Sequence, residues 1–208
     1  MPLLTSPDYS LEQALFDTGH RSICGVDEVG RGPMAGPVTA AAVILDPDNI
    51  PNGLNDSKKL LPVQREAAFE AIIATAHVSI TSLSAKTIDD MNIRAASLHA
   101  MALCVSALEV IPDHALVDGN VLPQHMPCPA TSVVKGDGRS LSIAAASIVA
   151  KVMRDRMMVV AEAHFPGYGL ASHKGYPTLA HKAALATYGV TPLHRRSFKP
   201  VQQVLVKS

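Results

Sequence analysis

The sequence predicts an α/β fold in which a partly antiparallel sheet is flanked by helices, and three observations support this. Apolar segments of strand length alternate with longer segments of helical spacing along the 208 residues. The first two strand segments lie within 22–45 on either side of a turn at Gly30–Gly32, which favours an antiparallel pair. Hydrophobic residues make up 48% of the chain, which is enough for the core of one main domain.

Composition narrows the functional classes. The chain has 18 basic and 18 acidic residues, so a nucleic-acid partner would require basic residues gathered on one face. The 3 cysteines lack the spacing of a disulfide framework or a zinc site, which predicts reduced thiols in a cytoplasmic protein. Residues 1–20 lack a signal-peptide pattern and no apolar segment is long enough to span a bilayer, so no membrane partner is expected.

Local patterns predict the elements of the first half. Residues 1–20 form a short N-terminal extension, with a helix at about 11–16 that Ser10 is expected to cap. A helix over about 62–76 is expected to begin with its proline, because the missing N–H of proline is harmless in the first helical turn. Alternating apolar and polar residues predict a half-exposed strand over 77–84.

A longer helix is predicted before the fourth strand. Thr87–Asp90 has the form of a capping box, and Asn92 offers a second cap. The core-facing stripe of this helix is formed by Leu98, Met101, Val105 and Leu108.

Two further strands and two helices complete the predicted fold. Strands are expected at 115–117 and 131–135. A helix over about 141–163 follows, and its small residues at 144–147 would let it approach the sheet closely. After a polar, glycine-rich loop, Thr178 is expected to cap a last helix that ends near residue 188, and a basic tail follows.

Four carboxylates at the predicted ends of elements are the main functional signal, and they are Asp27, Glu28, Asp118 and Asp137. Hard oxygen ligands of this kind select Mg²⁺ or Mn²⁺ rather than zinc. Two such cations about 4 Å apart can activate a water and stabilise the leaving oxygen in phosphodiester hydrolysis. The sequence therefore predicts metal-dependent phosphoryl transfer to water.

The residues alone leave this site with alternatives. Neighbouring residues of a strand point to opposite faces, so Asp27 and Glu28 should diverge unless the strand ends early or carries a bulge. Glu28 fits a surface acid as well as a metal ligand. Asp118 and Asp137 fit ordinary cap or turn residues as well as members of a site.

A series of motifs runs in order through nearly the whole chain, from about residue 20 to 201. The segment Gly25–Pro37 reads G-V-D-E-V-G-R-G-P-M-A-G-P. The later motifs are D-S-K-K-L at 56–60, V-D-G at 117–119, K-G-D at 135–137, A-A-S-I-V-A-K-V at 145–152, R-D at 154–155, H-K-G-Y-P-T at 173–178 and H-R-R-S-F at 194–198. Together they closely resemble the signature of ribonuclease HII, the type 2 ribonuclease H family.

This resemblance implies a ribonuclease H-like mixed sheet in a single domain over 1–208, with a C-terminal helical substrate-binding region at about 165–208. It implies an endonuclease that hydrolyses the RNA strand of RNA–DNA hybrids and nicks on the 5′ side of ribonucleotides embedded in duplex DNA. The ends would be 3′-hydroxyl and 5′-phosphate, and the role would be to remove misincorporated ribonucleotides and RNA primers. The family's acidic catalytic positions, which would bind Mg²⁺ or Mn²⁺, match Asp27, Glu28, Asp118 and Asp137.

The resemblance also implies substrate-binding positions. The family's junction-sensing turn matches Gly30, Arg31 and Gly32, whose glycines let the backbone approach a 2′-hydroxyl closely. Tyr176, which alone would fit packing, matches the tyrosine that contacts the ribonucleotide and stacks on the adjoining sugar. The candidates for phosphate contacts are Lys58, Lys59, Lys135, Arg139 and Lys174. Spacing alone favours a solvated loop for the first two.

Two departures from related families bear on partners. Type 3 relatives carry a substantial N-terminal substrate-binding domain and lack the Gly30–Gly32 turn, whereas only about twenty residues precede the motif here. Some relatives end in a sliding-clamp peptide with paired aromatics, and Gln202–Val206 has no aromatic, so no clamp partner is expected. The expected protein is a monomer.

Two other functional classes are weighed against the nuclease. One is a catalytically idle nucleic-acid-binding module, and the presence of all four acids argues against it. The other is a small-molecule phosphatase or nucleotide hydrolase. The long polar loop near Tyr176 and the scattered basic residues make that class less natural.

Overall fold

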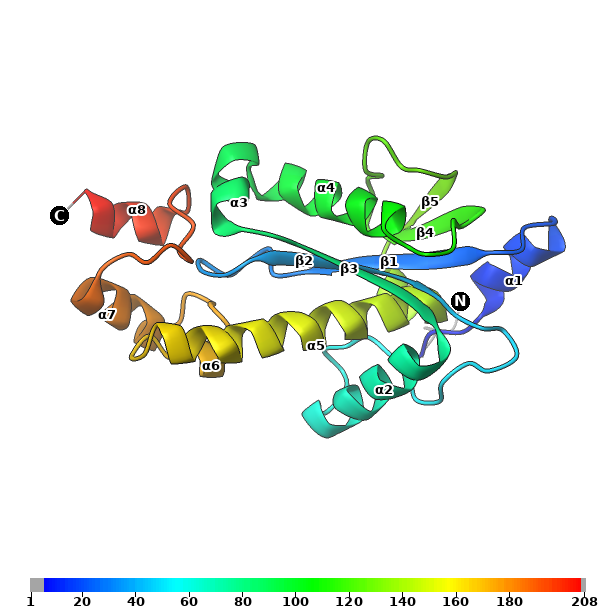
Figure 1. Ribbon diagram of the computed structural model, residues 1–208, viewed down its shortest axis with the longest axis horizontal. Coiled ribbons are helices and arrows are strands. Elements are labelled where there is room, and N and C mark those ends of the chain that lie inside the picture. Colours follow the sequence, from blue (N-terminus) through cyan, green and yellow to red (C-terminus); the bar gives the residue numbers. More distant parts are fainter. Residues whose placement is uncertain (1–5, 207–208) are drawn as a thin grey trace.

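A mixed five-stranded sheet forms the centre of the molecule (Figure 1). The computed structural model describes residues 6–206, so residues 1–5 of the expected extension and residues 207–208 lie outside the described part. The strands lie in the order β3-β2-β1-β4-β5. Their bounds are β1 Ile23–Val29, β2 Val38–Ile44, β3 His77–Leu83, β4 His114–Asp118 and β5 Ala130–Val133.

The sheet combines antiparallel and parallel pairs. β1 pairs with β2, and β2 with β3, in antiparallel fashion, whereas β1–β4 and β4–β5 are parallel. This confirms the α/β class and the antiparallel pair predicted within 22–45. Because β1 and β4 run in the same direction, their carboxyl ends lie at the same edge of the sheet. The acids that end these two strands are therefore brought together.

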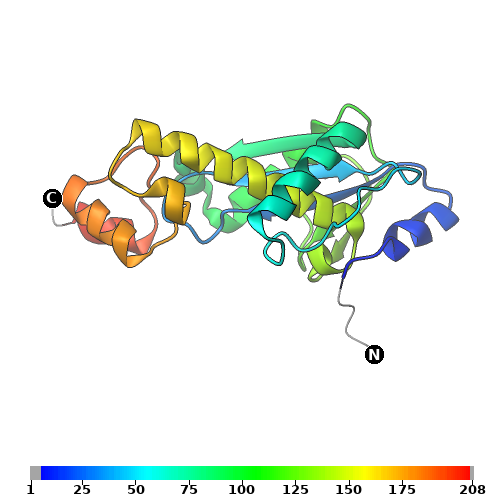
Figure 2. The same ribbon diagram turned by 90° about the horizontal axis from the view of Figure 1, so that it is seen from below.

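Helices cover both faces of the sheet, and their bounds are α1 Ser10–Asp17, α2 Pro62–Thr75, α3 Ala85–Met91, α4 Ile93–Ser106, α5 Leu141–His164, α6 Leu170–His173, α7 Leu179–Tyr188 and α8 Lys199–Leu205. Figure 1 shows α4 along one face and α5 with α2 on the other. The view from below shows an elongated molecule whose last three helices lie past the end of the sheet (Figure 2). Among the described helices, none combines the length and the apolar character that a bilayer crossing requires.

Helix α5 packs closely on β1 because both carry small residues at the contact. Its residues 144–146 are alanines with 0% exposure. On the strand side, a Cβ added to Gly25 would lie 2.0 Å from the carbonyl carbon of Ser142. The predicted flat face of this helix is thus confirmed, and Gly25 is the residue that lets the two backbones meet.

Three of the predicted helix starts are confirmed. Pro62 is the first residue of α2. The Asn92 side chain accepts the N–H of Ala95 at the start of α4, and the Thr178 hydroxyl accepts the N–H of His181 in α7.

Two predicted caps are wrong. Ser10 is the first residue of α1, and its N–H is accepted by the Asp8 carboxylate at 2.9 Å. Thr87 lies inside α3, whose cap is the Ser84 hydroxyl. The residue before α1 is Tyr9, which makes no side-chain cap, whereas α3 is capped three residues earlier than Thr87. The earlier start of α3 allows Ile88 to be fully buried within a complete helical turn.

The end of the chain differs most from its prediction. The strand expected over 131–135 ends at Val133, because Lys135 takes a left-handed conformation with φ of 55°. The loop expected over 167–178 contains the short helix α6. The basic tail expected at 194–198 leads into α8 and is partly buried. Hydrophobic spacing gave no signal for α6 or α8, since each has at most seven residues.

We expect Gly25→Ala to lower the free energy of unfolding by about 3 kcal/mol, because the added methyl overlaps the backbone of α5. Gly138→Ala is the matched control, since a Cβ there meets no atom within 4 Å. The control should change stability by less than about 0.5 kcal/mol. Urea unfolding followed by circular dichroism measures both. Equal losses in the two variants would contradict the close contact between α5 and β1.

Candidate active site

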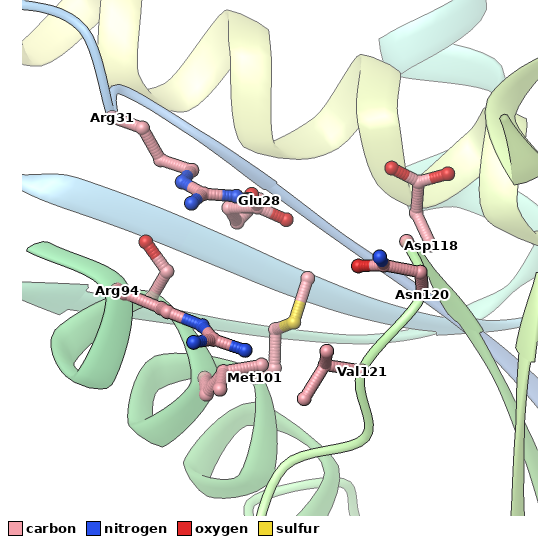
Figure 3. Close-up of a pocket in the computed structure, with 10 residues that line it drawn as sticks. Glu28, Arg31, Arg94, Met101, Asp118, Asn120 and Val121 are labelled. Atoms are coloured by element: carbon pink, nitrogen blue, oxygen red, sulfur yellow. Dashed lines mark hydrogen bonds and ion pairs between the residues drawn. The ribbon is translucent and has the colours of Figure 1, made fainter. Parts of the chain in front are cut away.

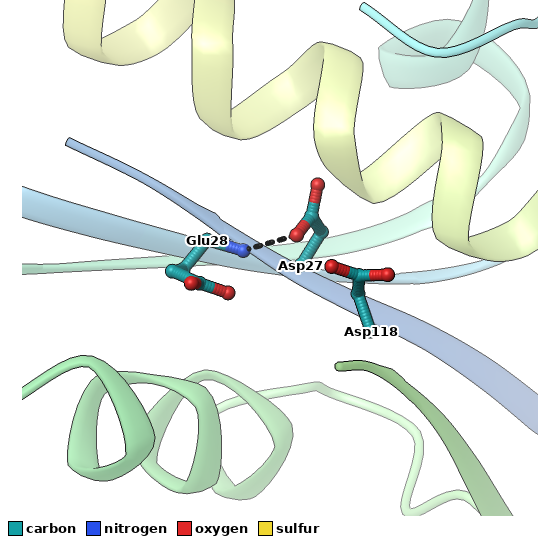
Figure 4. Close-up of side chains that lie close together, drawn as sticks. All are labelled: Asp27, Glu28 and Asp118. Atoms are coloured by element: carbon teal, nitrogen blue, oxygen red, sulfur yellow. Dashed lines mark hydrogen bonds between the residues drawn. The ribbon is translucent and has the colours of Figure 1, made fainter. Parts of the chain in front are cut away.

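Three carboxylates from two strands lie together at one edge of the sheet (Figure 4). Asp27 and Glu28 are neighbours in β1, and Asp118 is the last residue of β4. One carboxylate oxygen of each residue lies within 4.8 Å of the others. In Figure 4, Asp27 points toward α5 and Glu28 toward the opposite face, and Asp118 approaches from the neighbouring strand.

The two adjacent acids of β1 reach one site without the bulge or early turn that the sequence led us to expect. The pairing of β1 with β2 runs unbroken to Val29. On its other side, however, β1 pairs with β4 only as far as Val26 and Val117. The backbone edge beyond Val26 is therefore open. Asp27 and Glu28 leave opposite faces of the strand, and their side chains converge at this open edge.

Burial and repulsion between neighbouring carboxylates raise the pKa of two of the three acids. Burial raises the pKa of Asp27, and the charges of Glu28 and Asp118 add to the effect. The Glu28 N–H, 2.8 Å from Asp27 Oδ1, and the Ser147 hydroxyl partly offset it. Burial also raises the pKa of Glu28, where the Arg31 guanidinium opposes the shift and Asp118 adds to it. The site thus holds negative charge that its protein neighbours do not fully compensate.

The fourth predicted acid lies beside this group but outside it. Asp118 Oδ1 accepts the N–H of Gly136 at 2.7 Å, which ties the turn Gly136–Gly138 to the end of β4. Asp137 follows, with its carboxylate 3.6 Å from Lys58 Nζ. Burial raises the pKa of Asp137, and Asp56 and Asp118 add to this. Asp137 therefore lies on the same side of the molecule, held by Lys58 next to the three grouped acids.

The grouped acids fit a divalent cation with a preference for oxygen. All three offer carboxylate oxygens, the ligands that Mg²⁺ and Mn²⁺ prefer, and no histidine or cysteine belongs to the group. Buried carboxylates without sufficient cationic partners are unfavourable unless a positive charge enters. The donor set and its uncompensated charge thus both favour a Mg²⁺ or Mn²⁺ site formed by Asp27, Glu28 and Asp118.

Two fully buried arginines hold the loop at residues 30–37 next to the acids. Arg154 in α5 donates from Nε to the Pro37 carbonyl at 2.9 Å. Arg195 donates from Nη2 to the Gly30 carbonyl at 2.6 Å and from Nη1 to the Arg31 carbonyl at 3.1 Å. Both arginines are 0% exposed, and none of the ion pairs found within residues 6–206 includes either of them. The loop is thus fixed through its own backbone carbonyls.

This role of the arginines was not predicted from the sequence. Arg195 was expected only as part of a basic tail, whereas it is buried, which lowers its pKa to about 9, and the neighbouring Arg154 adds to the shift. A signal existed for Arg154, since it lies four residues from both Ala150 and Met158, which are buried on the same face of α5. No comparable spacing marks Arg195, which lies outside any helix or strand.

The turn Gly30–Gly32 connects the acids to Tyr176. Gly30 has a φ of +97°, and a Cβ there would lie 2.7 Å from the Pro37 carbonyl oxygen, so only glycine fits. Arg31 Nη1 lies 3.3 Å from Glu28 Oε1. A Cβ on Gly32 would lie 3.3 Å from the ring of Tyr176, which is 44% exposed. An accessible aromatic ring, a glycine backbone and the acid group therefore lie in one row.

The predicted phosphate-binding residues differ in their surroundings. Lys58 is exposed and forms an ion pair with Asp137 beside the acid group. Lys59 is also exposed but has no side-chain contact to the acids. The Lys174 ammonium donates to the carbonyl of Ala171 in its own loop. Lys135 and Arg139 are exposed beside the Gly136–Gly138 turn. Of the five, only Lys58 is held against an acid of the site.

A pocket opens beside the acids toward α4 (Figure 3). Glu28, Asp118 and Asn120 line it together with Arg94 of α4, and Figure 3 shows Asn120 beside Asp118. Arg94 and Asn120 were not predicted from the sequence. Arg94 lies three residues before Ser97, which lines the same pocket, so helical spacing was the signal that could have found it.

Comparisons with known proteins agree with this arrangement. Residues 24–201 match the family model for ribonuclease HII. The ribonuclease HII of Ruegeria pomeroyi is 57% identical over 202 residues, covering 97% of this chain and 86% of that protein. The ribonuclease H2 of Pyrococcus horikoshii superposes with a TM-score of 0.79 at 26% identity, covering 90% of this chain and 98% of that chain. The ribonuclease HII of Archaeoglobus fulgidus, solved in complex with PCNA, gives 0.75 at 26% identity, covering 86% and 96%.

We expect Asp27→Asn to raise the thermal midpoint of the metal-free protein, because the substitution removes a buried charge that repels two neighbours. The gain should be about 1–3 kcal/mol in unfolding free energy. Added Mg²⁺ should stabilise the native protein, by about 2.7 kcal/mol at a hundredfold excess over its dissociation constant, and should leave the variant unchanged.

Asp48→Asn, at an exposed turn position, is the control and should behave like the native protein with and without Mg²⁺. Differential scanning calorimetry measures all three proteins. A lower midpoint for metal-free Asp27→Asn would contradict the repulsion inferred for the acid group.

Proposed function

Since the chain belongs to the ribonuclease HII family, and is thus a metal-dependent nuclease that acts on the RNA of RNA–DNA hybrids, we propose that it also nicks duplex DNA on the 5′ side of embedded ribonucleotides. The products are 3′-hydroxyl and 5′-phosphate ends. The single observation that supports this most strongly is the row formed by the acid group, the Gly30–Gly32 turn and the ring of Tyr176. It combines a hydrolytic centre with a surface able to read one sugar.

The acids have distinct roles in this proposal. Asp27, Glu28 and Asp118 would hold the divalent cations, and Asp137, which lies beside them in contact with Lys58, would complete the set of ligands. Bound Mg²⁺ or Mn²⁺ supplies Lewis-acid activation of the scissile phosphate and of the attacking water. The Glu28 N–H, 2.8 Å from Asp27 Oδ1, keeps the Asp27 carboxylate in place. Preset ligands of this kind avoid reorganisation during the reaction.

The sugar is recognised by backbone and ring together. The glycines of the Gly30–Gly32 turn let the main chain approach a 2′-hydroxyl, which is the group that separates RNA from DNA. Tyr176 offers its ring to the adjoining sugar and its hydroxyl to the ribonucleotide. Its exposed position beside Gly32 supports this assignment. Cleavage is therefore directed to the junction where a ribonucleotide is present.

Basic side chains around the acid group and the turn hold the duplex through its phosphates. Lys58, Lys59 and Lys174 contact phosphates, so affinity falls as salt rises. The C-terminal helical region at about 165–208 supplies part of this substrate-binding surface within one domain. The three unpaired thiols agree with a reducing cytoplasm, where the enzyme removes misincorporated ribonucleotides and RNA primers as a monomer. No aromatic clamp peptide is assigned to Gln202–Val206.

We expect Asp118→Asn to reduce nicking of a duplex containing one ribonucleotide by at least about a thousandfold, or about 4 kcal/mol, because it removes a ligand charge with little change in volume. The native enzyme should nick with Mg²⁺ and stop with chelator. Gel analysis of an end-labelled duplex measures the rate and the position of the cut, and Asp48→Asn is the control. Full activity in Asp118→Asn would remove this residue from the site, and hydrolysis of free nucleotides alone would favour a different enzyme class.

We expect Tyr176→Phe to slow cleavage at an isolated ribonucleotide about tenfold, the size of one lost hydrogen bond of about 1.4 kcal/mol to the substrate. Tyr188→Phe is the matched control, because Tyr188 is 61% exposed and lies on α7 away from the turn. Single-turnover rates on the one-ribonucleotide duplex compare the two. Equal rates in both variants would argue against the hydroxyl contact.

A further inference from the structure

Two buried histidines connect Thr191 to the main chain of Tyr176. The Thr191 N–H donates to His194 Nδ1 at 3.1 Å, and the Thr191 hydroxyl lies 2.8 Å from the same nitrogen. His194 Nε2 lies 3.2 Å from His181 Nε2. His181 Nδ1 lies 2.9 Å from the carbonyl oxygen of Tyr176. The rings of His194 and His181 are 2% and 0% exposed, respectively, so this chain of hydrogen bonds runs through the core.

The donor and acceptor at the two ends of this series of hydrogen bonds fix the tautomer of each ring. The Tyr176 carbonyl can only accept, so His181 Nδ1 carries the proton and His181 Nε2 a lone pair. The Thr191 N–H can only donate, so His194 Nδ1 is the acceptor and the proton of His194 lies on Nε2. His194 Nε2–H therefore donates to His181 Nε2. Every bond is satisfied with both rings neutral.

The surroundings of the two rings favour this neutral form. Burial lowers the pKa of His194 to about 4, and His181 adds to the shift. Burial also lowers the pKa of His181, against an opposing contribution from the Tyr176 carbonyl, and His173, which stacks on it with ring centroids 4.2 Å apart, adds to the lowering. The uncharged ring of Tyr168 packs on His194. No carboxylate among the described residues pairs with either histidine.

The same segment also holds the Gly30–Gly32 turn. Arg195, directly after His194, binds the carbonyls of Gly30 and Arg31. Its own N–H donates to the Met34 carbonyl at 2.9 Å. One stretch of chain therefore contacts the Tyr176 loop through a histidine pair and the glycine turn through a guanidinium. This stretch supports both parts of the row, in addition to the Met34 N–H that joins the two loops directly at the Gly175 carbonyl (2.9 Å) and to the Arg154 contacts with the loop at residues 30–37.

We propose that His181 and His194 are positioning residues, which set the Tyr176 ring against the Gly30–Gly32 turn by a directional hydrogen-bond chain that ends on the Tyr176 carbonyl. Their role in catalysis rests on the proposed function, whereas the series of hydrogen bonds from Thr191 to the Tyr176 carbonyl does not. Neither ring contacts the acids or the substrate. They act by keeping the tyrosine in register with the turn that Arg195 holds.

The tautomers are tested by NMR of the native protein with ¹⁵N-labelled histidine at neutral pH. We expect long-range proton–nitrogen spectra to show His181 protonated on Nδ1 and His194 on Nε2, with both rings neutral. A neutral His181 protonated on Nε2, or a charged ring in either residue, would overturn the proposal. This readout is independent of activity, so it remains decisive if the native protein does not nick the duplex.

Substitutions test the consequence for cleavage. His181→Leu removes the side-chain donor to the Tyr176 carbonyl and leaves the Thr178 N–H, 2.8 Å away, as its backbone donor. This variant should slow nicking at a single ribonucleotide about tenfold, while His181→Asn retains a side-chain donor near Nδ1 and should stay within about threefold of native. His77, exposed at the start of β3, provides the control His77→Leu, which should be native-like. Circular dichroism and thermal midpoints verify folding of each variant.

A double-variant cycle separates positioning from general stability. If His181 acts through Tyr176, adding Tyr176→Phe to His181→Leu should cause no further loss beyond the larger single effect. Independent, multiplying losses would overturn the proposal, as would native rates in His181→Leu. If His181→Leu does not fold, the test uses His181→Asn and the spectrum of the native protein. The proposal is then overturned if folded His181→Asn cleaves slowly and the native spectrum lacks the Nδ1 tautomer of His181. Absence of nicking by the native protein would instead refute the proposed function.

Discussion

The arrangement of the site depends on two buried guanidinium groups that bind backbone carbonyls. A buried cation is costly unless its N–H groups are satisfied. All three nitrogens of the Arg195 guanidinium, and Nε and Nη2 of Arg154, donate to carbonyls of the loop at residues 30–37. The loop in turn is restricted to the one conformation that presents those carbonyls. Because a carboxylate partner would bind the arginine side chains without ordering the loop, the carbonyl contacts explain how a glycine-rich segment can be rigid enough to face a substrate.

Helix α5 transmits this order along the molecule. Near its start its small residues meet Gly25 of β1, further along the Ser147 hydroxyl favours the charged form of Asp27, and beyond that Arg154 holds the loop. These contacts lie on one side of one continuous helix, so the acid group and the Gly30–Gly32 turn keep a fixed separation. A long helix packed on the central strand is well suited to this because it has no internal hinge.

The acids oppose the stability that the arginines provide. Asp27, Glu28 and Asp118 gather negative charge at the open end of β1, where burial and repulsion raise the pKa of the first two. Their arrangement is unfavourable in the protein alone and becomes favourable with a bound divalent cation. Such conflicts between stability and function are expected at active sites, and here a rigid scaffold sustains one.

Local patterns in the chain were sufficient to predict the α/β class, the antiparallel opening pair and the close approach of α5, because periodicity and small residues are local properties. They marked four acids at element ends but did not decide between a structural role and a site role for Glu28, Asp118 and Asp137. They left open whether Asp27 and Glu28 could share a site, and they misplaced the caps of α1 and α3. The folded structure was needed to show that β4 leaves the edge of β1 open after Val26, that Asp137 lies beside the other acids with Lys58, and that Arg195 is buried. These outcomes depend on contacts between residues far apart in the chain, and no local pattern specifies which distant group will satisfy a buried charge.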